Sequence, residues 1–282
     1  MIYVEPMLGL CNRMRVIDSV LALNRERRHR TRIFWLRDRD LNCRFDELFE
    51  RPSGVDGVFD FATASSAGKF LKFLLPRVLQ NIASRAIHQK EMDSLLAGGL
   101  DFSSLLKLRS IYFRTWDRFF TGENPLAEFR LVPKLQAIVD GCNFERRRTV
   151  GIHIRRTDSP WCGESPTEAF TRLMNEEIAE RADTIFFVAT DDPEEEAHLQ
   201  RLFSGRILSH RKKNLDRNSP DGIKDAAVDL YCLSRCRKII GTNHSSFSEA
   251  ASQIGHCPLV VARNGAGQSA PLAVQSVAAN SN

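Results

Sequence analysis

Chemistry-bearing side chains gather at four places in the second half of the chain, each beside an apolar stretch. The first place holds a histidine, two adjacent arginines and an aspartate: His153, Arg155, Arg156 and Asp158. Two neighbouring guanidinium groups suit a diphosphate, because each can bind two oxygens through its planar fork. Asp158 could orient one of the two arginines. Taken alone, the segment also fits a surface arginine–aspartate pair.

The second place is a pair of carboxylates, Asp191 and Asp192, followed by Pro193. Paired carboxylates suggest metal binding or acid–base chemistry. An aspartate before a proline is equally typical of the first turn of a helix, where its side chain caps the backbone. Since no third ligand accompanies the pair, the sequence predicts no metal site.

The third place is Asp229, which lies among apolar residues in a predicted helix over 221–233. A carboxylate on such a face needs partners. A guanine edge is a well-suited one, because its N1–H and N2–H are two parallel donors. The alternative is an aspartate at the solvent boundary of the helix.

The fourth place is a hydroxyl-rich segment with one aromatic residue, running from Thr242 through Ser245, Ser246 and Phe247 to Ser248. A strand, then hydroxyl residues, then a helix can bind a phosphate through backbone N–H groups and hydroxyls. Ordinary helix capping by Ser245 explains the same pattern.

The elements that position these residues alternate between strands and helices, which predicts a doubly wound parallel sheet. Ligands of such sheets sit beyond the carboxyl ends of the strands, where all four places fall. Ser165 and Glu168 have the spacing of a capping box for the first helix of this half. The strands are expected at 149–154, 184–189, 206–209, 238–241 and 258–262, and the helices at 166–181, from Pro193, at 221–233 and at 246–254.

The first half of the chain alternates less regularly. We predict strands at 2–5, 31–36, 55–61 and 110–114, with helical structure at 13–28 and throughout 66–108. The resulting α/β architecture has two Rossmann-like lobes facing across a cleft. We place the first lobe at 1–145, the second at 146–265, and a flexible tail at 266–282.

Composition narrows the functional classes. The 282 residues are 43% hydrophobic and 27% charged, which is ordinary for a globular protein. The net charge of +5 is uneven: residues 1–150 carry 25 basic and 18 acidic residues (+7), and residues 151–282 carry 15 and 17 (−2). A basic half could face nucleic acid, a phosphate or a membrane surface, or it could be an ordinary solvated face. It holds no recognisable nucleic-acid motif or aromatic stacking set.

Seven scattered cysteines are expected to be free thiols in a reducing compartment. The first five residues predict a strand rather than a signal peptide, and no apolar run approaches the roughly 20 residues that span a bilayer. We therefore expect a cytoplasmic protein without a transmembrane segment.

Taken together and in order, the four places resemble the fucosyltransferase superfamily, which includes protein O-fucosyltransferases, α1,6-fucosyltransferases and bacterial nodulation fucosyltransferases. The resemblance covers about residues 148–255 and, more weakly, residues 6–20. It rests on five segments: His153-Ile-Arg-Arg-Thr-Asp158, Phe186-Phe-Val-Ala-Thr-Asp-Asp-Pro193, Asp225-Ala-Ala-Val-Asp-Leu-Tyr231, Ser245-Ser-Phe-Ser248 and Gly9-Leu-Cys-Asn-Arg13.

The resemblance implies a GT-B architecture and an inverting, metal-independent transfer of fucose from GDP-fucose to a hydroxyl of a glycan or protein acceptor, with no other cofactor. By the motifs, His153 and Asp229 would contact guanosine, and Arg155 and Arg156 would hold the diphosphate. The other donor-site residues would be Gly9, Asn12, Asp191, Ser245, Ser246 and Phe247, with Asn12 reaching over from the first lobe.

The sequence departs from the family pattern at the place where the general base is expected. Relatives with a carboxylate base carry a glutamate some residues after the paired arginines, and here Glu164 is one candidate and Asp158 a second. Two other interpretations stay open. One is a glycosyltransferase of the same fold with another nucleotide-sugar donor. The other is a non-catalytic protein that binds nucleotide or nucleic acid.

Overall fold

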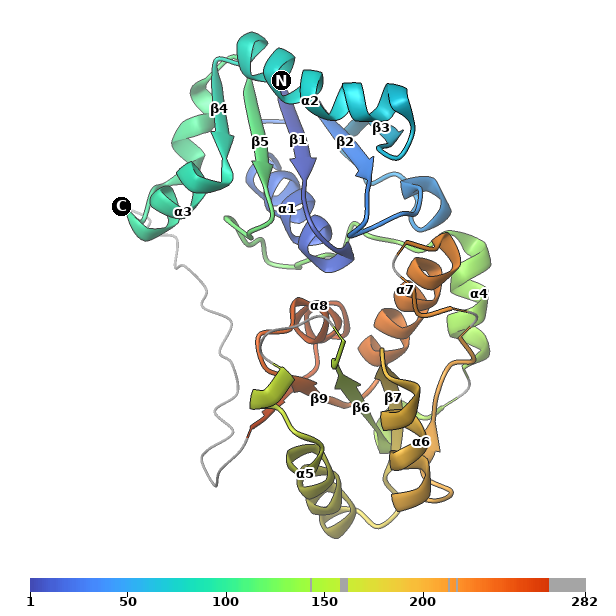
Figure 1. The fold of residues 1–282 in the computed structure, drawn as a ribbon. Helices are drawn as coiled ribbons and strands as arrows, with labels where there is room; N and C mark the ends of the chain where they lie inside the picture. The colour runs from blue at the N-terminus through green and yellow to red at the C-terminus, as the bar shows by residue number, and fades with distance from the viewer. Residues whose placement is uncertain (143, 158–161, 213, 217, 264–282) are drawn as a thin grey trace, which may run out of the picture. The chain divides into compact units, whose positions relative to one another are not determined.

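The structure is a computed structural model that describes residues 1–263 apart from residues 143, 158–161, 213 and 217 (Figure 1). The chain divides into two compact units. Unit 1 comprises Met1–Gln136 and Lys212–Ala227, and unit 2 comprises Ala137–Arg211 and the chain from Val228 onward. Our sequence-based boundary at 145 thus lies nine residues beyond the end of the first segment of unit 1, and 212–227 return to that unit. The tail predicted at 266–282 lies outside the described residues.

Unit 1 is built on a parallel five-stranded sheet with the order β3-β2-β1-β5-β4. Alternation along the strands gives the sheet two apolar faces. One face carries Phe34, Leu36 and Tyr112 and is covered by Leu79 of helix α2. The strands are β1 (Ile2–Pro6), β2 (Thr31–Arg37), β3 (Val55–Ala62), β4 (Arg85–His88) and β5 (Ile111–Thr115).

The helices of unit 1 connect these strands. Helix α2 runs from the end of β3 to the start of β4 (Figure 1). We predicted helix throughout 66–108, and β4 shows that this prediction was wrong for residues 85–88. The α-helices are α1 (Leu10–Leu23), α2 (Ser66–Ile82) and α3 (Gln89–Ala97), and the 3₁₀ turns are η1 (Phe45–Glu47) and η2 (Phe102–Lys107).

Unit 2 is built on a second parallel sheet with the order β10-β9-β6-β7-β8. The two parallel sheets confirm the predicted α/β class with Rossmann-like sheets. The strands are β6 (Thr149–Ile154), β7 (Ile185–Thr190), β8 (Ile207–Leu208), β9 (Lys238–Thr242) and β10 (Leu259–Ala262). The helices are α4 (Pro133–Gly141), α5 (Thr167–Glu180), α6 (Pro193–Leu202), α7 (Pro220–Ser234) and α8 (Ser246–Gly255), with 3₁₀ turns η3 (Arg146–Arg148) and η4 (Cys162–Glu164). By the division into units, the first residues of α4 and α7 belong to unit 1.

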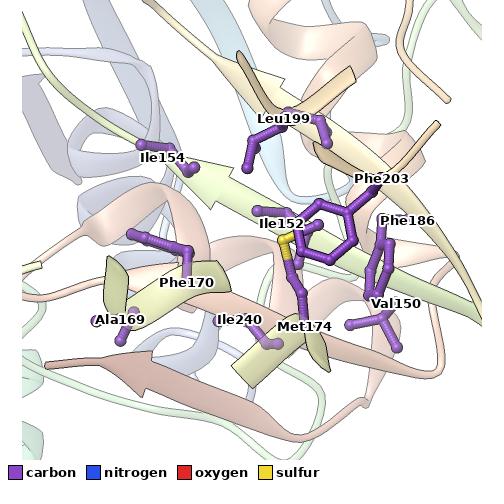
Figure 2. Packing of buried hydrophobic residues seen from close by; sticks show 12 residues of the cluster. Val150, Ile152, Ile154, Ala169, Phe170, Met174, Phe186, Leu199, Phe203 and Ile240 are labelled. Carbon is purple, nitrogen blue, oxygen red and sulfur yellow. The ribbon is translucent and has the colours of Figure 1, made fainter. Parts of the chain in front are cut away.

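Strand β6 is buried along its whole length, which explains why its sequence is mostly apolar. Val150, Ile152 and Ile154 point to one face and join a core cluster with residues of α5, α6, β7, β9 and β10 (Figure 2). Gly151 faces the other way, where an added Cβ would lie 2.8 Å from Cδ2 of Leu233. The central strand is therefore fixed by packing on both of its faces.

The predicted capping box at the start of α5 is wrong. The helix starts at Thr167 after Pro166, and no side chain caps it. The hydroxyl of Ser165 instead donates to the carbonyl of Ala262 (2.6 Å) and accepts from the N–H of Asn243 (2.9 Å). Ser165 thus ties η4 to the ends of β9 and β10.

Six cysteines are free thiols, as predicted, and the side chain of Cys162 is not described. Burial raises the pKa of the Cys43 thiol to about 12 and that of Cys257 to about 11. These thiols are therefore protonated at neutral pH. Among the described residues, no helix is long and apolar enough to cross a bilayer.

Candidate functional site

The candidate site lies in unit 2, at the carboxyl ends of β6 and β9. The order of the sheet reverses between these two neighbouring strands, because β6 leads outward to β7 and β8 while β9 leads to β10. A parallel sheet leaves room for a ligand at such a point. The structure thus places the predicted segments 153–157 and 242–248 side by side.

The backbone after β6 is held by two side chains from neighbouring strands. The hydroxyl of Thr242, at the end of β9, accepts from the N–H of Arg155 (3.0 Å). The carboxylate of Asp191, just after β7, accepts from the N–H of Arg156 (2.8 Å) and from the N–H (3.3 Å) and hydroxyl (2.7 Å) of Thr157. These bonds fix where the two arginine side chains start.

Asp191 is ionised in this position. Burial alone would raise the pKa of its carboxyl, but the bonds from the Thr157 hydroxyl and from the two backbone N–H groups outweigh burial and hold the pKa below its ordinary value. Asp192, in contrast, caps α6 by accepting from the N–H of Glu194 (2.9 Å). Both carboxylates therefore have roles that require no metal ion. The described residues contain no group of three or more potential metal ligands.

The guanidinium of Arg156 is directed into the fold. Its Nε and Nη2 atoms each donate to the carboxylate of Glu195 (3.2 Å), and Nη1 donates to the carbonyl of Ser165 (2.7 Å). Nη2 also donates to the hydroxyl of Thr167 (3.0 Å). The side chains of Arg156 and Glu195 are only 16% and 10% exposed. Arg156 therefore ties the loop after β6 to α5 and α6.

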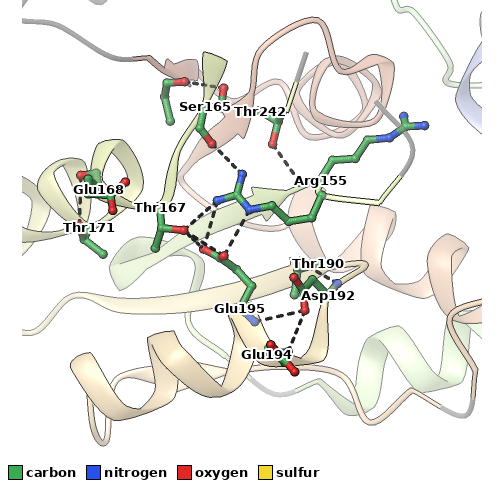
Figure 3. Close-up of polar contacts among 12 residues, drawn as sticks. Arg155, Ser165, Thr167, Glu168, Thr171, Thr190, Asp192, Glu194, Glu195 and Thr242 are labelled. Atoms are coloured by element: carbon green, nitrogen blue, oxygen red, sulfur yellow. Dashed lines mark hydrogen bonds and ion pairs between the residues drawn. The ribbon is translucent and has the colours of Figure 1, made fainter. Parts of the chain in front are cut away.

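Arg155 takes the opposite direction. Figure 3 shows its side chain extending away from Glu195, Thr167 and Ser165. Its backbone N–H is the group that Thr242 holds, and the residue is half-buried. Of the two adjacent arginines, Arg155 is thus the one whose guanidinium lies outside the Glu195 network.

A stacked pair lies beneath the start of α8. The ring of Phe247 stacks on that of His153, with 4.7 Å between centroids and 20° between planes. The Nδ1 atom of His153 lies 2.8 Å from the hydroxyl of Ser248 and 3.5 Å from that of Ser245. Ser246 is the first residue of α8. The predicted residues of this segment therefore gather around one buried imidazole.

The close approach of α8 to β9 depends on Gly241. A Cβ added to this residue would lie 2.6 Å from the Cβ of Ser248, well inside contact distance. The start of α8 would then have to move away from His153.

We expect Gly241→Ala to lower the free energy of unfolding by about 1–3 kcal/mol, because an extra methyl group in a packed interior forces side chains and backbone to shift. Urea denaturation of the full chain measures this effect. Gly141→Ala is the control, since nothing lies within 4 Å of its added Cβ. Equal stability of the two variants would contradict the packing argument.

Glu164, one of the two candidates for the general base, lies in η4 with its side chain exposed. Its carboxylate accepts from the side-chain amide of Asn243, whose oxygen in turn accepts from Arg263 (2.8 Å). Asp158, the other candidate, lies outside the described residues.

The remaining predicted residues are placed as follows. Asp229 lies in α7 and is 4% exposed, so the buried position inferred from its apolar neighbours is confirmed. Gly9 and Asn12 belong to unit 1, where Gly9 precedes α1 and Asn12 lies in its first turn, not in a loop. The side-chain oxygen of Asn12 accepts from Arg15 (2.7 Å).

The backbone before α1 is positioned by Arg13, which is fully buried and lies over the ring of Trp35. Its guanidinium donates to the carbonyls of Leu8 and Leu36 and to the carboxylate of Asp38. Burial has the largest effect on the pKa of the Arg13 guanidinium and lowers it, while the nearby carboxylate of Asp38 acts in the opposite direction. In the sequence, Arg13 stood out only as the last residue of the segment Gly9-Leu-Cys-Asn-Arg13, with no predicted role of its own.

Two further residues of the site were not predicted to take part in it. Glu195 holds the side chain of Arg156, and Asn243 joins Glu164 to Arg263. Thr242, the first residue of the predicted hydroxyl-rich segment, holds the backbone of Arg155. The run of three glutamates at 194–196 is typical of the start of a helix. For that reason the sequence did not indicate that the middle one, Glu195, pairs with Arg156.

The fold defined by the two parallel sheets is that of fucosyltransferases of known structure. The chain aligns with the NodZ alpha-1,6-fucosyltransferase co-crystallized with GDP over 92% of its length and 94% of that chain, with 16% identity and a TM-score of 0.64. A structure of fucosyltransferase NodZ from Bradyrhizobium gives 15% identity, the same coverage and a TM-score of 0.60.

Two other fucosyltransferases share this fold. The Arabidopsis thaliana FUT1 mutant R284K in complex with GDP has 13% identity and a TM-score of 0.58 over 92% of this chain and 69% of that one. POFUT1 in complex with GDP has 12% identity and a TM-score of 0.56 over 93% and 97%. No family model and no curated protein matches the chain. The likeness is therefore one of fold.

Proposed function

We propose that this chain is an inverting, metal-independent fucosyltransferase that transfers fucose from GDP-fucose to a hydroxyl of a glycan or protein. The observation that carries the proposal is the arrangement at the switch point of the second sheet. There Thr242 holds the backbone of Arg155 at the end of β9, and Ser245, Ser246 and Ser248 line the start of α8 a few residues further along the chain. The shared fold with NodZ, FUT1 and POFUT1 supports it, because structures of all three contain GDP or GDP-fucose.

The chemistry of the donor explains why these groups suit it. When the bond between fucose C1 and the β-phosphate oxygen breaks, GDP leaves with additional negative charge on that phosphate. A guanidinium in fixed position stabilises this charge most as it develops. We assign this task to Arg155. The first N–H groups of α8 lack carbonyl partners within the helix and favour an anion.

Asp229 supplies the preference for the base in this proposal. A buried carboxylate on α7 accepts two donors at once, and only guanine among the common bases offers the N1–H and N2–H pair. The acceptor hydroxyl attacks C1 from the face opposite to GDP and gives its proton to a base, for which Glu164 and Asp158 stay the two candidates.

The experiment is calorimetric titration of the full chain with GDP, UDP and ADP in the presence of a chelator. We expect clear binding of GDP and much weaker binding of UDP and ADP. Equal binding of the three nucleotides, or no binding either in the chelator or after addition of excess Mg²⁺, would overturn the assignment of the donor. Absence of GDP binding in the chelator that excess Mg²⁺ restores would overturn metal independence alone.

Asp229→Asn tests the guanine contact. We expect the affinity for GDP to fall about ten- to a hundredfold, because a hydrogen-bonded pair with a charged group is lost and the new amide N–H₂ opposes the donors of the base. The same titration measures the change. Asp225→Asn is the matched control on the same helix, since its carboxylate accepts from the N–H of Asn214 (3.2 Å). An unchanged affinity in Asp229→Asn would remove this residue from the site.

A further inference from the structure

Helix α2 of unit 1 presents an apolar stripe to solvent. Phe70 and Phe73 are 65% and 71% exposed, and Ile82 is 55% exposed. Leu74 and Val78 lie between them at helical spacing and are also exposed. Residues 70, 74, 78 and 82 are each four positions apart, and Phe73 is three positions from Phe70. The five side chains therefore form one band along the helix. This band is defined here as the outer stripe of α2.

The outer stripe cannot turn inward, because the opposite side of α2 is fixed to the sheet. Leu79 is buried in the cluster with Phe34 and Tyr112. At the start of the helix the hydroxyl of Ser65 accepts from the N–H of Gly68, and an added Cβ at Gly68 would overlap the backbone of β3. Helix α2 thus carries apolar residues both on the side that packs on the sheet and on the side that faces solvent.

The charge around the outer stripe has one sign. Residues 61–90 contain five lysines and arginines and no aspartate or glutamate. Lys69, Lys72 and Arg77 lie on α2 itself and are exposed. None of these three forms an ion pair with a described residue. A large apolar band thus stands beside three cations that form no ion pair with a described residue.

We propose that the outer stripe of α2 docks onto an anionic phospholipid bilayer. A helix with exposed Phe and Leu side chains and flanking lysines lies in the plane of the interface, with its apolar residues among the acyl chains and its cations at the headgroups. The alternative occupant, a second copy of this chain, would bring two basic faces together, and like charges oppose such a pair. The inference is independent of the proposed reaction.

Co-flotation of the full chain with vesicles tests the proposal. We expect binding to phosphatidylcholine vesicles that contain phosphatidylglycerol and little binding to phosphatidylcholine alone. Phe70→Ser with Phe73→Ser should weaken binding at least about tenfold, because two aromatic side chains no longer leave water. Leu202→Ser with Leu208→Ser is the control, since these leucines are 54% and 38% exposed on unit 2 and should not matter.

The charges give a second, separable result. Lys69→Gln with Lys72→Gln should weaken binding to the anionic vesicles about tenfold or more at low salt, and added salt should weaken the wild type in the same way. Circular dichroism should show unchanged melting for all these variants, since the side chains are exposed. Absence of flotation with anionic vesicles, or flotation that the phenylalanine variant does not reduce, would overturn the proposal. A lipid-free dimer that this variant abolishes would also overturn it, because a second copy would then be the occupant.

Discussion

Arg155→Ala is expected to lower the rate of fucose transfer by about two to three orders of magnitude, the size of the loss when one preorganised charge-stabilising donor is removed. The Glu195 network should be unaffected, because the guanidinium of Arg155 lies outside it (Figure 3). The measurement is the rate of GDP release from GDP-fucose with the best acceptor of the wild type, together with the melting temperature.

Arg155→Lys is the matched control for this prediction. It keeps the charge but loses the planar fork that binds two oxygens, so an intermediate rate is expected. A near-normal rate in Arg155→Ala would exclude its role at the leaving phosphate, whereas a variant that melts early would show that the residue holds the fold.

Arg156→Ala is expected to affect the stability of the fold more than the rate of transfer. The side chain forms four hydrogen bonds to Glu195, Ser165 and Thr167. Its removal leaves a carboxylate that is 10% exposed without its cation. We expect the free energy of unfolding of unit 2 to fall by about 3–5 kcal/mol, as when one partner of a buried ion pair is deleted. Chemical denaturation followed by circular dichroism measures it.

A double variant separates the ion pair from general damage. Arg156→Ala combined with Glu195→Ala should be more stable than Arg156→Ala alone, because the unpaired carboxylate is removed as well. If Arg156→Ala unfolds at the same denaturant concentration as the wild type, the positioning role is wrong. The two arginines, assigned one shared role from the sequence, are thus expected to differ in which property they control.

The second sheet was predictable because its strands are buried on both faces. β6 and β7 are mostly apolar, and polar residues that mark the carboxyl edge lie at the end of each. β4 was missed because only Ile87 of its four residues is buried, and a strand between two helices with one buried side chain has no visible period. The local sequence pattern predicts a strand or helix only where buried residues recur at the spacing of that element.

The roles of the site residues were less predictable, because they depend on partners distant in sequence. Arg156 finds Glu195 39 residues away, and Glu164 finds Asn243 79 residues away. Nothing in a run of two arginines reveals which one points into the fold. The positions of His153, Phe247 and Ser248 were easier, since parallel strands bring their carboxyl ends to one edge.

The contacts of Asp191 have a consequence for which anions the site can accept. Consecutive backbone N–H groups, such as those of Arg156 and Thr157, are the kind of donor pair that attracts phosphate and other anions. Here a carboxylate of the same chain occupies them permanently. As a tethered competitor it acts at an effective concentration far above that of any dissolved phosphate. Free anions are therefore excluded from the turn beside Arg155.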